Sequence, residues 1–283
     1  MKKPLLSILM ITYNHESYIE QAIKGVFSQK VNFPVEFVIS NDCSTDKTHQ
    51  KIEEILKDSP ENFTIKYYNH TENLGMMENF IFSLKQCQGK YIALCEGDDY
   101  WIDNNKLQKQ LHFLESNPDF SLCFSNSIIV NELDVPTQLD LVKLESKEYF
   151  ESDLFSSWLI PTASTLFINR FNEEDYKILK DPRVFFGDII VFLILANKGR
   201  LFGMKDYTSA YRINSSSYTN QPKTIVYYEK LFNHLSLLSE LFDYKYKNFN
   251  QKKLSDQGYK LFRYYLIKLN PKILKYIKFV FNK

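Results

Sequence analysis

The chain has 283 residues and a net charge of +1; 44% of its residues are hydrophobic and 24% are charged, and it contains 8 Gly. This composition supports a sizeable core in one large domain or in a domain with an appendage, and it excludes a disordered chain, a Gly-rich dinucleotide loop and a P-loop. Residues 245–283 contain 11 Lys and Arg and one acid, which leaves the first 244 residues with 24 basic and 33 acidic side chains. This net charge of −9 argues against nucleic acid as the main partner.

Apolar runs alternate with segments of helical periodicity over residues 5–130. The predicted strands are Leu5–Ile11, Val35–Ile39, Phe63–Tyr68, Tyr91–Leu94 and Ser121–Val130. The predicted helices are Ser17–Phe27, one capped by Ser44 or Thr45 with Asp46 in its first turn, Met76–Cys87, and one that contains Leu107–Leu114. This alternation predicts an α/β fold with a Rossmann-like, mostly parallel mixed sheet flanked by helices.

The second half of the chain is less regular. Asn131–Leu154 is polar and mixed, and we interpret it as a variable surface loop. We predict a strand at Thr162–Ile168, a helix at Asp188–Asn197 and an extended segment at Phe202–Tyr211. Three more helices are predicted, at Thr224–Phe242, Lys253–Leu269 and Lys272–Phe281, with a break at Asn270-Pro271. The chain is therefore expected to end in a helical extension.

Cysteine usage and the start of the chain both indicate a cytoplasmic protein. The four cysteines are widely spaced and form no C-x-x-C pair, so we expect reduced thiols. The apolar run Leu5–Ile11 is short and lacks a small-residue cleavage site, so we interpret it as a strand and not as a signal peptide. No segment approaches the ~20 apolar residues of a transmembrane helix.

Three carboxylates, Glu96, Asp98 and Asp99, follow the predicted strand Tyr91–Leu94. They are expected at the carboxyl edge of the sheet, where open α/β sheets bind ligands. Mg²⁺ and Mn²⁺ use one or two carboxylates together with substrate phosphates, and crowded acids repel one another unless a cation joins them. The alternative is a solvated turn in which Asp98 or Asp99 caps the next helix, and this stretch alone leaves both interpretations open.

Polar residues also follow the three preceding strands. Thr12, Tyr13 and Asn14 can hydrogen-bond a base or a ribose, and Asn14 can also cap the next helix. Asp42 can accept from the N–H of a base or from a ribose hydroxyl. Asn73 lies in a loop-to-helix turn that is expected to line the same cleft.

In chain order these strings are Thr12-Tyr13-Asn14, Asn41-Asp42-x-Ser44-Thr45-Asp46, Asn73-x-Gly75 and Glu96-Gly97-Asp98-Asp99. Each is common alone, but the ordered set resembles the family 2 glycosyltransferases, which have the type A nucleotide-diphosphosugar transferase fold. The resemblance covers residues 4–130 closely and 155–218 more loosely. It implies an inverting transfer from a nucleotide-diphosphosugar, a UDP-sugar by family habit, with Mn²⁺ or Mg²⁺ as cofactor.

The resemblance also implies roles for individual residues. The residues that match the family's nucleotide-sugar-binding segments are Thr12, Tyr13, Asn14, Asp42 and Asn73, with Asp42 reading the base. Asp99 is the expected metal contact, and Asp98 is expected beside it in the metal site, holding ribose or the donor sugar. Glu96 stands where many relatives have Asp, which leaves the order of these roles open by one residue.

Asp188 is the candidate general base. It follows Phe185-Phe186-Gly187 at the start of a predicted helix, where relatives place an acid. An inverting transfer needs one base that takes the proton of the acceptor hydroxyl as its oxygen attacks the anomeric carbon. The alternative role for Asp188 is a helix N-cap, and the presence of the other motifs favours the base.

Arg212 and Asn214 lie where many relatives carry Tyr-Arg-x-His-x-x-Ser. Arg212 can bind a diphosphate through two hydrogen bonds or form a structural ion pair. Asn214 replaces the family's His, which helps with the metal or the pyrophosphate, and an amide can offer an oxygen or a donor but no charge. The five histidines are scattered and predict no zinc site.

The expected domains are a catalytic domain at 1–220, with a nucleotide-sugar-binding half at 1–130 and an acceptor-side half at 131–220, and a basic helical extension at 221–283. In the last predicted helix, Lys272, Lys275 and Lys278 recur at three-residue spacing, with apolar residues on another side. This amphipathic helix either packs against the catalytic domain or contacts an anionic cytoplasmic leaflet as a peripheral anchor. The second interpretation suits a lipid-linked acceptor made at the inner face of the membrane.

The expected function is metal-dependent transfer of a hexosyl or N-acetylhexosaminyl unit to a hydroxyl of a glycan or lipid-linked acceptor in surface polysaccharide biosynthesis. One alternative is a catalytically degenerate, transferase-like scaffold subunit, against which the intact Asp98, Asp99 and Asp188 argue. The other is a sugar-nucleotide pyrophosphorylase, which would typically carry a Gly-rich, basic N-terminal loop that the chain lacks after its first strand.

Overall fold

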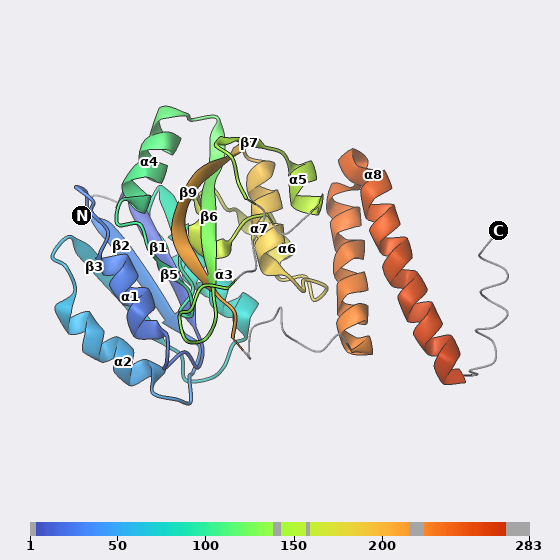
Figure 1. The fold of residues 1–283 in the computed structure, drawn as a ribbon, viewed down its shortest axis with the longest axis horizontal. Helices are drawn as coiled ribbons and strands as arrows, with labels where there is room; N and C mark the ends of the chain where they lie inside the picture. The colour runs from blue at the N-terminus through green and yellow to red at the C-terminus, as the bar shows by residue number, and fades with distance from the viewer. Residues whose placement is uncertain (1–3, 138–142, 157–158, 215–223, 270–283) are drawn as a thin grey trace. The chain divides into compact units, whose positions relative to one another are not determined.

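The computed structural model describes residues 4–137, 143–156, 159–214 and 224–269. The chain divides into two compact units, Met1–Lys180 with Val191–Ser215, and Asp181–Ile190 with Ser216–Lys283. The first unit contains the sheet, and the second contains the long C-terminal helix (Figure 1).

The described part of the first unit contains a nine-stranded sheet in the order β3-β2-β1-β4-β8-β6-β9-β5, with β7 paired to β9 (Figure 1). The strands are β1 (Leu6–Thr12), β2 (Val35–Asn41), β3 (Phe63–Asn69), β4 (Tyr91–Leu94), β5 (Tyr100–Trp101), β6 (Phe120–Val130), β7 (Lys147–Tyr149), β8 (Leu166–Ile168) and β9 (Arg200–Arg212). The run from β3 to β4 is parallel, as is the β6–β9 pair, whereas β8, β5 and β7 pair antiparallel with their neighbours. The predicted mixed, mostly parallel sheet is confirmed.

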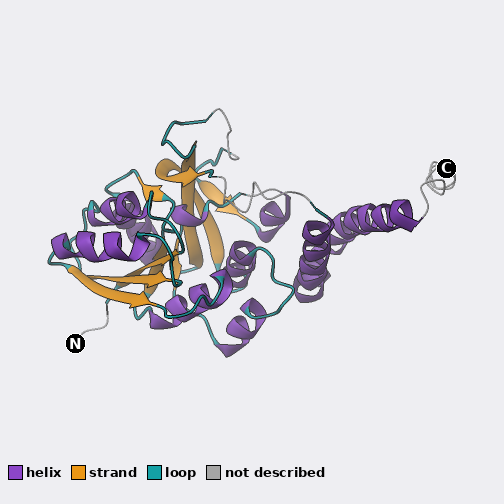
Figure 2. Ribbon diagram, turned by 90° about the horizontal axis from the view of Figure 1, so that it is seen from below, coloured by secondary structure: helices purple, strands orange, loops and turns teal. Residues whose placement is uncertain are grey.

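Helices cover both faces of this sheet (Figure 2). In chain order they are α1 (Ile19–Phe27), α2 (Thr48–Ile55), α3 (Met76–Gln86), α4 (Lys106–Ser116), α5 (Glu151–Ser156) and α6 (Glu173–Leu179), with 3₁₀ turns η1 (Leu56–Asp58) and η2 (Thr162–Ser164). The apolar stripe of α1 is buried, and α1 packs against α2, whereas α3 packs against β1 and β2. Every residue of β1, β2 and β4 is buried, as is typical of parallel strands covered on both faces.

The order of the strands positions the candidate site. The chain leaves β1 through α1 to reach β2 on one side, and it returns through α3 to β4 on the other side of β1. The carboxyl ends of β1 and β4 therefore flank the point where the strand order reverses, and open α/β sheets bind ligands at such a point.

The second unit consists of Asp181–Ile190 and helix α8 (Ile225–Leu269), while helix α7 (Gly187–Ala196) crosses the boundary between the units. Within α8, the Nζ of Lys260 lies 5.5 Å from the ring centroid of Tyr228. A straight helix would separate these two residues by roughly 48 Å. The chain therefore reverses direction inside α8 and forms two antiparallel stretches, which Figure 1 shows side by side. No helix in the described part of the chain is long and apolar enough to cross a membrane.

Several elements differ from the predictions. The predicted loop Asn131–Leu154 contains β7 and the start of α5, and the predicted strand Thr162–Ile168 begins as the turn η2 before it becomes β8. Helix α2 begins at Thr48, so the predicted capping by Ser44 or Thr45 is wrong. The predicted helix Lys272–Phe281 lies outside the described residues.

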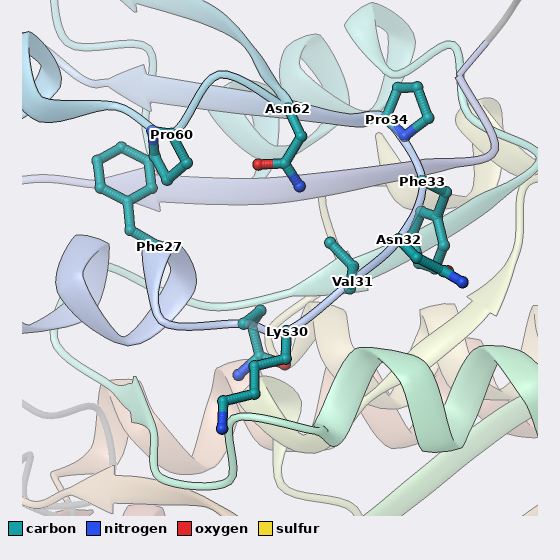
Figure 3. A pocket seen from close by; sticks show the side chains of 9 residues that line it. Phe27, Lys30, Val31, Asn32, Phe33, Pro34, Pro60 and Asn62 are labelled. Carbon is teal, nitrogen blue, oxygen red and sulfur yellow. The ribbon is translucent and has the colours of Figure 1, made fainter.

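A hollow of about 450 Å³ lies near the starts of β2 and β3 (Figure 3). Its lining includes Phe27, Lys30, Val31, Phe33, Pro34 and Pro60. Because it lies at the amino ends of these strands, it is separate from the residues that follow their carboxyl ends.

Candidate active site

The loops after β1, β2 and β4 are joined directly by backbone hydrogen bonds. The amide of Asp42 donates to the carbonyl oxygen of Thr12 over 2.9 Å, and the amide of Gly97 donates to that of Ile11 over 3.0 Å. A Cβ atom at position 97 would lie 2.5 Å from the Oγ1 of Thr12, so only glycine allows the acidic loop to lie this close to β1. The predicted nucleotide-binding and acidic segments therefore meet at one edge of the sheet.

Asn14 joins the first loop to the second. Its side-chain Oδ1 accepts from the amide of Thr45 over 2.8 Å, and its own amide donates to the Oγ of Ser44 over 2.9 Å. Asn14 is held at a φ of 54°, a conformation that Asn tolerates better than most residues. The alternative of a helix cap is wrong for Asn14, because the N-cap of α1 is Tyr18.

Three more hydrogen bonds strengthen the same connection. The amide of Glu16 donates to Asp46 over 3.0 Å, and the amide of Lys47 donates to the Glu16 carboxylate over 2.9 Å. The amide of His15 donates to the Oγ1 of Thr48 over 2.8 Å. Partial burial raises the pKa of Asp46, but hydrogen bonds from the Thr48 side chain and from the amides of Thr48 and Glu16 outweigh it and keep that pKa below its usual value. The two loops are therefore fixed before any ligand binds.

Asp42 fixes the third loop. Its carboxylate oxygens accept from the amides of Leu74 and Gly75 over 2.7 and 2.9 Å, and its carbonyl accepts from the side chain of Asn73 over 3.0 Å. Asp42 is buried, whereas Asn73 is exposed. A carboxylate has further lone pairs, so Asp42 can anchor this loop and still accept from a ligand.

The two aspartates of the acidic loop have different surroundings. The side chain of Asp98 is 24% exposed, whereas Asp99 is 2% exposed and accepts from the amide of Arg212 over 2.9 Å through Oδ1. Among the described residues, the buried Oδ2 of Asp99 has no hydrogen-bond partner. Burial, and then the nearby charges of Asp98 and Glu96, raise the pKa of Asp99 well above its usual value. Negative charge is therefore crowded at this loop.

The side chain of Arg212 is buried, and each nitrogen of its guanidinium has a hydrogen-bond partner within the protein. Its Nε donates to the carbonyl of Asp98 over 2.9 Å, and its Nη2 contacts both Gln21 and Asp134, each over 2.7 Å. Its Nη1 donates to the carbonyl of Asn131 over 3.2 Å. The guanidinium also lies 4.5 Å from the ring centroid of Tyr18. This geometry supports the structural ion pair that was one of two interpretations for Arg212, and it makes Arg212 a positioning residue for the acidic loop.

Two side chains approach the partly exposed carboxylate of Asp98 from other segments. The Nδ2 of Asn214 lies 3.4 Å from its Oδ2, and the Nε2 of His15 lies 3.9 Å from the same oxygen. Sequence reasoning treated His15 as one of five scattered histidines. Its place directly after Thr12-Tyr13-Asn14 was the signal that could have drawn attention to it.

The residues at this edge fit a hard divalent cation. No group of three or more His, Cys, Asp and Glu side chains in the described ranges is arranged to hold a metal. Mg²⁺ and Mn²⁺ need only one or two carboxylates when substrate phosphates supply the other ligands. The partly exposed carboxylate of Asp98, the neighbouring amide of Asn214 and the crowded negative charge meet that requirement.

Asp188 lies in the second unit, in the first turn of α7. Its Oδ1 accepts from the amide of Ile189 over 2.8 Å. The segment before it is anchored on α8, because the amide of Phe185 donates to His234 over 3.3 Å, and Arg183 forms an ion pair with Glu240 over 2.6 Å. Burial lowers the pKa of His234 to about 4, so its imidazole stays neutral at neutral pH. The general-base role of Asp188 stays a prediction.

Lys106, at the start of α4, is an unusual buried cation. Its Nζ donates to the Oε1 of Gln110 over 2.8 Å and to the carbonyl of Thr165 over 3.2 Å, and it lies 4.5 Å from the ring centroid of Trp101. Burial lowers the pKa of Lys106 to about 7. Through Trp101, Lys106 contacts the chain that follows the acidic loop.

Comparison with known protein sequences gives the following relatives. Residues 7–174 match the family model described as glycosyl transferase family 2. An uncharacterized protein of Mycobacterium tuberculosis is 40% identical over 127 residues, which are 45% of this chain and 36% of that protein. The match to this chain therefore spans little more than a third of the length of that relative. The putative teichuronic acid biosynthesis glycosyltransferase TuaG of Bacillus subtilis is 29% identical over 224 residues, which are 78% of this chain and 84% of TuaG.

Solved structures share the fold. TarS of S. aureus in complex with UDP-GlcNAc has a TM-score of 0.64 and 18% identity, and the match covers 94% of this chain and 75% of TarS. The mannosyltransferase PcManGT from Pyrobaculum calidifontis, in complex with GDP-Man and Mn²⁺, has a TM-score of 0.56 and 14% identity, and the match covers 83% of this chain and 64% of that one. At these identities the likeness shows the fold alone.

Proposed function

Because the chain belongs to glycosyl transferase family 2 and has its type A fold, we propose that it is an inverting glycosyltransferase that uses a nucleotide-diphosphosugar donor. The observation that carries this proposal is the joining of three strand-end loops, which brings Thr12, Asp42 and Asp98 to one edge of the sheet. A diphosphate with its cation and its nucleoside would lie across this edge.

Thr12, Tyr13, Asn14, Asp42 and Asn73 form the proposed nucleotide side of the site. Recognition of a base needs rigidly positioned hydrogen-bond donors and acceptors. The loops that carry these residues are fixed to one another by the hydrogen bonds of Asn14, Glu16 and Asp42. Tyr13 is exposed beside this edge and offers an aromatic face. Such preorganisation lowers the entropic loss on binding.

Asp98 and Asp99 remain the proposed metal pair, and the direct contact is assigned to Asp98 because its carboxylate is partly exposed and Asp99 is buried. Asp99 holds the β9 end through the amide of Arg212, and Arg212 in turn holds the carbonyl of Asp98. A bound Mn²⁺ or Mg²⁺ would neutralise the charge that develops on the diphosphate leaving group. Asp188 would take the proton from the acceptor hydroxyl as that oxygen attacks the anomeric carbon.

The donor is proposed to be a UDP-sugar that supplies a hexosyl or N-acetylhexosaminyl unit, which agrees with the UDP-GlcNAc bound by TarS. The acceptor is proposed to be a hydroxyl of a glycan or of a lipid-linked intermediate in surface polysaccharide biosynthesis, which agrees with the name of TuaG. The basic residues near the C-terminus support a peripheral position at the inner face of the cell membrane. Residues 1–220 are proposed as the catalytic domain, and residues 221–283 as its extension.

Calorimetric titration of UDP into the protein, with and without Mn²⁺, tests this proposal. We expect binding that depends on Mn²⁺ and that Asp98→Asn weakens on the order of 10-fold or more, because the substitution removes the charged cation ligand. Asp99→Asn serves as a matched comparison that changes the neighbouring residue, and it should weaken binding less. Absence of binding for UDP, and then for GDP and dTDP, would favour a transferase-like scaffold subunit instead.

A further inference from the structure

His15, Asp98 and Asn214 converge on one point from three separate segments of the first unit. His15 follows β1, Asp98 follows β4 and Asn214 follows β9. The Oδ2 of Asp98 is common to both contacts, at 3.9 Å from the Nε2 of His15 and 3.4 Å from the Nδ2 of Asn214. More than 80 residues separate each member from the next, so their meeting depends on the tertiary structure.

The ring of His15 is held in a defined orientation. Its Nδ1 lies 3.2 Å from the Oγ1 of Thr12, and its backbone amide is tied to Thr48. Gly97 also packs against this ring, since a Cβ there would lie 2.9 Å from the Nδ1 of His15. A histidine that binds a metal generally donates its second ring N–H to an oxygen, which fixes the tautomer. Thr12 offers such an oxygen, and the lone pair of Nε2 then faces Asp98.

The distance between His15 and Asp98 suits a shared cation better than a direct hydrogen bond. A separation of 3.9 Å between the Nε2 of His15 and the Oδ2 of Asp98 is too long for a hydrogen bond. Two ligand atoms that each lie about 2.1 Å from one cation are about 3.0 Å apart at a right angle and about 4.2 Å apart when opposite. Both measured separations fall in this interval. A half-turn of the Asn214 amide exchanges its nitrogen and oxygen positions and presents an oxygen to the same point.

We propose that His15 is a ligand of the divalent cation, together with Asp98 and the amide oxygen of Asn214. In this arrangement, the imidazole that many relatives place at position 214 is supplied by the loop after β1. The inference rests on the proposed function, because the phosphates of the nucleotide complete the coordination of the cation. An imidazole nitrogen is a softer donor than an oxygen, so His15 shifts the preference of the site from Mg²⁺ toward transition-metal cations.

Pulsed electron paramagnetic resonance of Mn²⁺ bound to the full chain with UDP tests the proposal directly. We expect a ¹⁴N coupling from a coordinated imidazole in the wild-type protein, and its loss in His15→Asn. The substitution should also weaken Mn²⁺ binding in the presence of UDP on the order of 10-fold. His112→Asn is the matched control, because His112 is exposed on α4, and it should leave both the coupling and the affinity unchanged.

The outcomes separate the inference from the proposed function. If Mn²⁺ and UDP bind together but the wild-type spectrum shows no ¹⁴N coupling, the role of His15 is overturned and the proposed function stands. If neither UDP nor GDP supports Mn²⁺ binding, both are overturned. Should His15→Asn fail to fold, wild-type protein with ¹⁵N-labelled histidine carries the test, because the label alters the coupling when a histidine nitrogen is bound and leaves it unaltered when none is.

Discussion

Lys106 should make the protein less stable at neutral pH than at alkaline pH. Burial lowers the pKa of its ammonium group from 10.5 to about 7 in the folded protein. Because the folded pKa is the lower one, the unfolded chain binds more protons between these two values. The free energy of unfolding that is linked to Lys106 is therefore highest above pH 10.5, and it decreases as the pH falls toward 7.

The size of the effect follows from the two pKa values. One pKa unit corresponds to about 1.4 kcal/mol, so the whole shift of Lys106 is limited to about 5 kcal/mol. Between pH 6 and pH 8.5, the same linkage raises the free energy of unfolding by about 2 kcal/mol. Lys106→Met keeps most of the side-chain volume and removes the titration. It also removes the donor to the Oε1 of Gln110 and one of two donors to the carbonyl of Thr165, which keeps the amide of Leu94. This loss is about 1 kcal/mol for each bond and does not vary with pH.

Urea unfolding of wild type and Lys106→Met at several pH values between 6 and 8.5 measures this effect. The difference between the two proteins isolates Lys106, because all other groups titrate in both. We expect the free energy of unfolding of the wild type to rise by about 2 kcal/mol relative to the variant across this range. Parallel pH profiles would refute the reasoning and would mean that water or a counter-charge solvates the buried ammonium group.

Three further predictions concern the site and the tail. Asp188→Asn should reduce transfer by several orders of magnitude and leave UDP affinity unchanged in calorimetry; loss of both would contradict the role of general base. Asp42→Asn offers one acceptor to two backbone amides, so it should lower the free energy of unfolding by about 2 kcal/mol and weaken UDP binding. Asn73→Ala should have a smaller effect on both quantities. Equal effects of the two substitutions would argue against Asp42 as the residue that anchors the loop. A chain that ends at Leu269 should lose sedimentation with anionic vesicles and keep UDP binding; undiminished sedimentation would rule out the tail as the anchor.

The long elements could be predicted because their periodicity is strong. The largely apolar run Val35–Ile39 in β2 and the buried apolar stripe of α1 each give a clear pattern. The two-residue strand β5 carries no such signal, and it exists because Tyr100 and Trp101 pair with β9 more than a hundred residues later. The capping of α2 was mispredicted because Ser44 and Thr45 bind Asn14, a partner that only the tertiary structure supplies.

The sequence was enough to predict which loops form the site, but not the contacts among their side chains. Parallel strands bring their carboxyl ends to one edge, so chain order was enough to predict that Asp42 and Asp98 lie near each other. The sequence could not show that the guanidinium of Arg212 is buried, because Gln21 on α1 and Asp134 in the loop after β6 are both distant from it in the chain. The same holds for His15, whose approach to Asp98 depends on the fit of Gly97 against β1.

The side-chain ties between the loops have a consequence for hydrogen exchange. Loop amides normally exchange rapidly, but the amides of Glu16, Thr45, Leu74 and Gly75 are bound to side-chain oxygens. Their opening requires release of Asn14, Asp46 or Asp42, so they should exchange in step with the ends of β1 and β2. The rim of the sheet would then open as one cooperative unit, and a deuterium uptake map would register these loops as part of the core.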